Sequence, residues 1–293
     1  MTSDQLNAFL AVVERKNLTR AARALRLSQP GLTRQLQALE RELGARLLVR
    51  TARGVKPTEA GERFATYARR ALDDLHAGRA ALDALRDEPR GAVAVGAIFT
   101  VGAALMPEAV KRIRARYPDV RLLLVHGEAD ALERELASGA LDLAVLTMPL
   151  KHLDLVAQRL WQEDLVVAAP KGHPLARLRR PVELGELAGV PLLSTRAGAA
   201  KRAVEVACEA RGERPDFVVE TDSSEALARL VEQGVGVAVI PAVMASPGRR
   251  FDAIPIAPPG LKRQIALAHR GEAYLTAAAR AVRAELLSCL RRV

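Results

Sequence analysis

One face of residues 28–44 carries amide, hydroxyl and guanidinium groups. Leucines recur at helical spacing through this segment and would be buried as one stripe: Leu32, Leu36, Leu39 and Leu43. The positions left off that stripe are Gln29, Gly31, Thr33, Arg34, Gln37 and Arg41. Such polar groups hydrogen bond to base edges in the DNA major groove, which has room for an α-helix. The pattern therefore favours DNA recognition, although a helix face that only meets solvent has a similar composition.

The segments before this one can position it. Asn17 is placed to cap a helix over Leu18–Leu25, and a three-residue turn follows. Ser28 is placed to cap the next helix, whose natural end is Gly44. Two helices joined by a short turn, the second with a polar face, predict a helix-turn-helix.

A hairpin is predicted directly after the second of these helices. Ala45–Arg50 and Val55–Thr58 have the composition of two short strands, and the turn between them carries Arg53. An arginine at the tip of such a wing can enter a minor groove or touch a phosphate. The alternative is a loop arginine without a role.

A long helix is predicted from Thr58 to about Arg86. Its small and apolar positions alternate steps of four and three, which suits pairing with a second helix: Phe64, Ala68, Ala71, Leu75, Gly78, Leu82 and Leu85. The alternative is packing against the N-terminal domain of the same chain. The run Asp87-Glu88-Pro89-Arg90-Gly91 then breaks the helix and indicates a domain boundary.

The formal charge of +10 is concentrated at the N-terminus. Residues 1–58 hold 11 Lys and Arg against 4 Asp and Glu, whereas the remaining residues hold 33 against 30. Cations that contact phosphates dominate affinity for nucleic acid. The distribution therefore supports DNA binding by the first fifth of the chain. Proteins that bind membranes, and proteins encoded by GC-biased genomes that favour arginine, are also basic.

Several other classes of protein are disfavoured. The sequence contains neither a Gly-x-Ser-x-Gly elbow nor a phosphate-binding Gly-x-x-x-x-Gly-Lys loop, so we expect no enzyme. The 2 cysteines and 5 histidines lack metal-ligand spacing, and we expect no metal or cofactor. No apolar run reaches membrane-spanning length and the start lacks a signal-peptide pattern, so we expect a soluble cytoplasmic protein. A secreted solute-binding protein or an enzyme built on the second region alone is the alternative.

The rest of the chain alternates short β-rich runs with amphipathic helices, which predicts an α/β region with mostly parallel strands. The expected strands are Ala92–Ile98, Arg121–Val125, Asp142–Leu146, Asp164–Ala169, Pro191–Thr195, Phe217–Glu220, Val235–Ile240 and Arg263–His269.

The stretch Asn17–Leu48, NLTRAARALRLSQPGLTRQLQALERELGARLL, closely resembles the helix-turn-helix signature of LysR-type transcription regulators. Five further segments resemble that family in the right order: RTARGVKPTEAGERF, RYPDVRLLL, SGALDLAV, HPLA and LVEQGVGVAVIP. Essentially the whole chain is covered. The departures are Gly31, Thr33, Leu18 and Leu48, where alanine, serine and two phenylalanines are usual, and none removes a group that DNA needs.

The resemblance implies an N-terminal all-α winged helix-turn-helix over 1–58, a linker and dimerisation helix over 59–90 and an effector domain over 91–293. That domain would consist of two Rossmann-like α/β lobes like those of type II periplasmic binding proteins, lobe I over 91–162 plus 264–293 and lobe II over 163–263. The implied partners are an operator duplex, a small-molecule co-inducer and further copies of the chain, as a homodimer and usually a homotetramer. An activator of this kind would also contact RNA polymerase.

With the resemblance, the residues expected at DNA are Thr19, Arg20, Ser28, Gln29, Pro30, Gly31, Thr33, Arg34, Gln37, Arg50 and Arg53. In the effector domain, loops that follow parallel strands supply ligand groups. The residues expected there are Thr100, Val101, Glu128, Thr147, Thr195, Ser223 and Ser224, with Ile98 and Phe99 as apolar lining. Each hydroxyl is as well suited to capping a helix, and Glu128 leaves the charge of the effector open.

Cys208 raises the question of redox sensing, because one branch of this family senses peroxide through a cysteine pair. The partner expected about nine residues earlier is missing, since Ala199 and Ala200 occupy that place. A buried structural thiol is the preferred interpretation.

Overall fold

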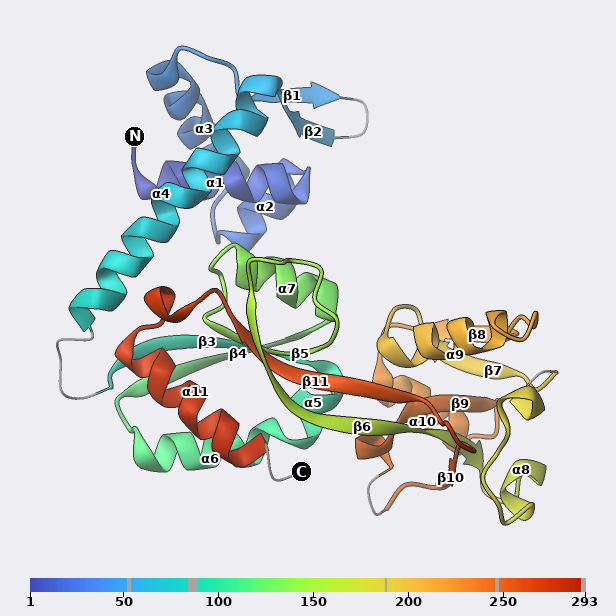
Figure 1. Cartoon of the computed structure of the whole chain (residues 1–293). Helices are drawn as coiled ribbons and strands as arrows, with labels where there is room; N and C mark the ends of the chain where they lie inside the picture. The colour runs from blue at the N-terminus through green and yellow to red at the C-terminus, as the bar shows by residue number, and fades with distance from the viewer. Residues whose placement is uncertain (52–53, 84–88, 188, 246–247, 291–293) are drawn as a thin grey trace. The chain divides into compact units, whose positions relative to one another are not determined.

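The computed structural model describes residues 1–51, 54–83, 89–187, 189–245 and 248–290. The chain separates into two compact units, Met1–Leu85 and Arg86–Val293 (Figure 1). Each unit has its own hydrophobic core, so each is described separately.

The first unit consists of three helices, a hairpin and a long helix. Its elements are α1 (Ser3–Arg15), α2 (Leu18–Ala24), α3 (Gln29–Leu43), β1 (Leu48–Thr51), β2 (Gly54–Pro57) and α4 (Glu59–Asp83). The predicted caps are confirmed: Asn17 accepts from the Arg20 N–H at 2.9 Å, and Ser28 accepts from the Gly31 N–H at 3.2 Å. Gly44 ends α3 in the left-handed conformation, with φ of 62°.

Only part of the predicted seam on α4 is exposed. Phe64 packs against Phe9, with ring centroids 5.5 Å apart, and Ala68 is buried in the core of the first unit. The prediction that these two residues belong to a dimer seam is therefore wrong, because they cover α1 of their own chain. Further along α4, Leu75 is 59% exposed and Leu82 is 67% exposed. Ala71 and Gly78 are also exposed, and Leu85 lies outside the described residues.

The second unit contains nine described strands. They are β3 (Gly91–Ile98), β4 (Val120–Gly127), β5 (Leu143–Thr147), β6 (Val156–Pro170), β7 (Leu192–Thr195), β8 (Phe217–Thr221), β9 (Val237–Pro241), β10 (Phe251–Pro255) and β11 (Lys262–His269). The helices are α5 (Phe99–Ala104), α6 (Met106–Arg116), α7 (Ala129–Ala137), α8 (Pro174–Arg177), α9 (Ala199–Glu209), α10 (Ser224–Glu232) and α11 (Ala277–Leu290). Short 3-10 helices occupy Leu184–Leu187, Ala242–Met244 and Glu272–Tyr274.

Two long antiparallel strands join two α/β lobes in this unit (Figure 1). β6 pairs with β11 over 156–164, and its remaining residues pair with β9 and β10. Lobe I holds the order β4-β3-β5-β11, and lobe II holds β6-β9-β7-β8 with β10 beside β6. The lobes have separate cores, one from α6, α7, α11 and the first strands, the other from residues between Leu165 and Ile256.

The expectation of mostly parallel strands is wrong. Among the described strands of this unit, four pairings are parallel and four are antiparallel. The antiparallel pairings all involve β6 or β11, because the chain crosses from lobe I to lobe II along β6 and returns along β11. The sequence analysis also missed β10, the helix α5 and the first half of β6.

Candidate nucleic-acid interface and ligand cleft

The polar face of α3 is accessible. Ser28, Gln29, Pro30, Arg34 and Gln37 are exposed, while Gly31 and Thr33 are half-buried. Leu32, Leu36 and Leu39 on the opposite face are buried in the core, so burial fixes which side chains of α3 point outward.

The other residues expected at DNA lie on neighbouring elements of the first unit. Thr19 and Arg20 are exposed in the first turn of α2, and Arg50 is exposed on β1. Arg53 lies outside the described residues. The Thr19 hydroxyl donates to Oε1 of Gln29 at 3.2 Å. This bond restrains the Gln29 side chain and leaves its NH₂ group available as a donor.

Side-chain hydrogen bonds attach the hairpin to α3 and α4. The Glu40 carboxylate of α3 accepts from the N–H groups of Leu47 and Leu48, at 2.7 and 3.1 Å. Thr58 donates to the Arg46 carbonyl at 2.7 Å and accepts from the Gly61 N–H at 3.0 Å. Arg46 and Leu47, where the first strand was expected to begin, take part in these bonds instead of strand pairing. The strand β1 therefore starts later, at Leu48.

Gly61 is required by a close approach of α4 to the hairpin. A Cβ atom at this position would lie 2.0 Å from the Leu47 carbonyl oxygen, well inside any allowed contact. The hairpin is therefore held at a fixed place beside α3 by backbone packing and hydrogen bonds together. Sequence reasoning did not single out Glu40 or Gly61.

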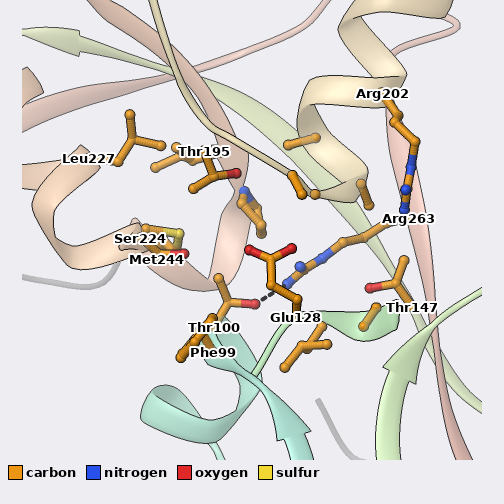
Figure 2. Close-up of a pocket in the computed structure, with 18 of the residues that line it drawn as sticks. Phe99, Thr100, Glu128, Thr147, Thr195, Arg202, Ser224, Leu227, Met244 and Arg263 are labelled. Atoms are coloured by element: carbon orange, nitrogen blue, oxygen red, sulfur yellow. Dashed lines mark hydrogen bonds between the residues drawn. The ribbon is translucent and has the colours of Figure 1, made fainter. Parts of the chain in front are cut away.

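A pocket of about 110 Å³ lies between the two lobes of the second unit (Figure 2). Five of the seven predicted effector residues line it: Thr100, Glu128, Thr147, Thr195 and Ser224. Ile98 and Phe99 line it as well. The pocket therefore takes groups from the carboxyl ends of β3, β4 and β5 in lobe I and of β7 and β8 in lobe II.

Two of the predicted residues are placed differently. Val101 is fully buried in the core of lobe I, because it lies on the inward face of α5, and its assignment to the pocket is wrong. Ser223 caps α10 by accepting from the Ala226 N–H at 3.2 Å, and it lines a neighbouring hollow with His126 and Arg249.

The most buried polar group of the pocket is Arg263, which is 7% exposed. Its Nε donates to Glu163 at 2.7 Å, and its Nη2 donates to the Thr100 hydroxyl at 3.0 Å. The other oxygen of Glu163 accepts from the Val243 N–H at 2.7 Å. Burial lowers the pKa of Arg263, while the adjacent carboxylate of Glu163 raises it. The Arg263–Glu163 pair lies where β6 and β11 cross between the lobes. It contacts Thr100 in lobe I and Val243 in lobe II.

Carboxylates from both lobes face the pocket. Asp130 is paired with Lys151, whose hydrogen bond holds the pKa of that carboxyl below its usual value. Glu128 precedes α7 but makes no capping hydrogen bond, and its carboxylate points into the pocket in Figure 2. Burial, and then the charges of Asp130 and Asp222, raise the pKa of Glu128, while Arg202 and Arg196 lower it.

Arg263, Glu163, Arg202, Asp222 and Met244 were missed by the sequence analysis. Arg263 was named only as the first residue of an expected strand, at the boundary of lobe II. A charged residue inside an otherwise buried strand was the available signal, because an unpaired charge is rarely buried without a role.

No group of three or more His, Cys, Asp or Glu in the part of the chain that the structure describes is arranged to hold a metal ion. Within the same residues, no helix is both long and apolar enough to cross a membrane.

Comparison with known proteins identifies the family. Residues 3–62 match the family of bacterial regulatory helix-turn-helix proteins of the lysR family, and residues 86–290 match the LysR substrate binding domain. The chain therefore belongs to the LysR family of DNA-binding transcription regulators.

Individual relatives agree over most of their length. A hydrogen peroxide-inducible genes activator of Pectobacterium carotovorum is 31% identical, covering 92% of this chain and 90% of that protein. The transcriptional regulator AlsR of Bacillus subtilis is 30% identical, covering 80% and 79%. The full-length CbnR solved in complex with its target DNA superposes with a TM-score of 0.58 and 25% identity, covering 100% of this chain and 99% of that chain.

Proposed function

We propose that this regulator binds a two-fold symmetric operator as a dimer or tetramer in the bacterial cytoplasm, and that a small molecule in the cleft of the second unit controls it. The observation that carries the proposal is the cleft itself, which takes polar groups from two lobes joined only by β6 and β11 among the described strands. A ligand that contacts both lobes favours one lobe arrangement over others, which is the differential affinity that a switch requires. If the protein activates transcription, RNA polymerase is a further partner.

The DNA-binding part is tested by selecting duplexes from a random pool with the full-length protein. We expect enrichment of an inverted repeat whose half-sites lie about one or two helical turns apart, because two copies of α3 must reach the same face of the duplex. Raising the salt from about 50 to 200 mM should weaken binding by roughly 10³-fold or more, as expected for several phosphate contacts. A selected pool without a common sequence would contradict specific recognition.

We further propose that the switch is ligand binding rather than thiol oxidation, although one relative is a peroxide-inducible activator. Cys208 is buried, and burial raises the pKa of its thiol, which lowers the fraction of reactive thiolate. The residues nearest to the expected partner position, Ala199 and Ala200, begin α9.

Peroxide treatment should therefore leave operator affinity unchanged, both for the natural chain and for Cys208→Ser. The measurement is operator titration after incubation with hydrogen peroxide, with mass spectrometry of Cys208 and Cys289. Oxidation of Cys208 together with a shift in affinity that the serine variant lacks would refute this part of the proposal.

A further inference from the structure

Two carboxylates face the cleft from opposite lobes. Glu128 lies at the end of β4 in lobe I, and Asp222 follows β8 in lobe II. Neither side-chain carboxylate makes a hydrogen bond or an ion pair with another described residue, whereas the carboxylate of Asp130 beside them is paired with Lys151. Each carries its negative charge toward the same pocket.

These charges are close enough to affect each other. Burial raises the pKa of Glu128 most, and the negative charge of Asp130 and, to a smaller extent, that of Asp222 raise it further, while the positive charges of Arg202 and Arg196 lower it. Holding two like charges in a partly desolvated cleft costs free energy unless a cation lies between them. The described cation lining this part of the pocket without a carboxylate partner is Arg202, at the start of α9.

Arg263 gives a second and independent indication of a ligand. It is buried to more than nine-tenths, and it extends into the pocket in Figure 2. Its Nε and Nη2 are bonded to Glu163 and Thr100, while its Nη1 has no hydrogen-bond partner among the described residues. Because the Thr100 oxygen accepts from Arg263, the Thr100 hydroxyl can still donate its proton. Nη1 of Arg263 and the Thr100 hydroxyl are therefore two adjacent donors that an acceptor group of a ligand could bind.

We propose that the effector is a small zwitterion of amino-acid type, whose ammonium group lies between Glu128 and Asp222 and whose carboxylate accepts from Arg263 and Thr100. This inference rests on the proposed function and specifies the ligand of the same cleft. An ammonium shared by Glu128 and Asp222 would join the two lobes and remove their mutual repulsion. A ligand with only negative groups could accept from Arg263 and lie near Arg202, but it would place a further negative charge beside Glu128 and Asp222.

The test uses the full-length protein and three sets of probes at millimolar concentration. The first set is the twenty protein amino acids, the second is their 2-oxo acids, which lack the amine, and the third is a series of dicarboxylates. Binding is measured by thermal shift and then by calorimetry. We expect at least one amino acid to bind and its 2-oxo acid to bind at least about tenfold more weakly, because a buried charged hydrogen bond is lost.

The variants are Glu128→Gln and Asp222→Asn, one in each lobe, with Glu209→Gln as the matched control. Glu209 is exposed at the end of α9, outside the pocket. Glu128→Gln should lower the affinity for the amino acid by about 10- to 100-fold, and Asp222→Asn should also lower it. Without ligand, Glu128→Gln should raise the melting temperature by about 2 to 4 °C, because burial and the nearby carboxylates make the charge of Glu128 unfavourable in the folded state. Glu209→Gln should change neither quantity.

A dicarboxylate or 2-oxo acid that binds in preference to every amino acid, and binds more tightly to Glu128→Gln, would overturn this inference while leaving ligand control through the cleft intact. If none of the amino acids binds in either measurement, the inference is also overturned. DNA recognition is judged separately by the duplex selection, so the two failures can be told apart.

Discussion

Replacing Arg263 with methionine should lower the free energy of unfolding of the second unit by about 3 to 5 kcal/mol. The substitution leaves the Glu163 carboxylate buried with only the Val243 N–H as a partner. It also removes the donor to Thr100, so the cleft loses its most buried polar contact. At about 2 to 4 °C per kcal/mol for a domain of this size, the melting temperature should fall by roughly 6 to 20 °C.

Thermal unfolding of residues 86–293 within the full-length protein measures this effect. Arg180→Met is the matched control, because Arg180 also makes two bonds to a carboxylate, Glu186, but on the surface. It should change the melting temperature little, since water and salt screen exposed pairs. The double variant Arg263→Met with Glu163→Gln should recover part of the loss. A loss from Arg263→Met no greater than that of the control would show that the buried pair does not hold the crossing strands.

Replacing Leu75 and Leu82 together with glutamate should weaken self-association by at least about 100-fold. Both leucines are exposed on α4 at a spacing of seven, on a stripe with Ala71 and Gly78. In a symmetric pair each substitution occurs twice, and each buried leucine contributes about 1.5 to 3 kcal/mol. Operator affinity should fall with dimerisation, because the two half-sites would no longer be bound as one unit.

Sedimentation and operator titration of the same samples test this second prediction. Thr66→Glu is the control, because Thr66 is exposed on α4 and helical spacing places it on the side opposite to Leu75 and Leu82. It should leave both quantities unchanged. A Leu75→Glu, Leu82→Glu protein with the mass of the natural assembly would rule out this stripe as the dimer contact.

The elements of the first unit could be predicted from the sequence because their signals are local. Asn17, Ser28 and Gly44 each fix one end of a helix through a bond or a conformation within four residues. The leucine stripe of α3 then determines which side chains remain outside. The sequence could not predict which part of α4 packs within the chain and which part stays exposed, because the same spacing suits packing on Phe9 and packing on a second copy.

The centre of the cleft depends on contacts between distant residues, which a periodic pattern does not contain. Arg263 meets Glu163 and Thr100 across 100 and 163 residues of sequence. The hydroxyls at Thr147 and Thr195 could be predicted because they lie at the carboxyl ends of strands, and such ends gather at one edge of a sheet. Val101 was misplaced because α5, a single short helix, turns that side chain into the core of lobe I.

The most direct test of the central claim, that α3 reads DNA sequence, is titration of Arg34→Ala against the selected operator and a scrambled duplex. We expect a loss of about 1 to 3 kcal/mol on the operator, roughly 5- to 150-fold, because an arginine on the exposed face of α3 can bond to a guanine edge. Affinity for the scrambled duplex should change far less. Equal losses on both duplexes would make Arg34 a phosphate contact, and unchanged affinity for the operator would contradict the assignment of α3 as the reading helix.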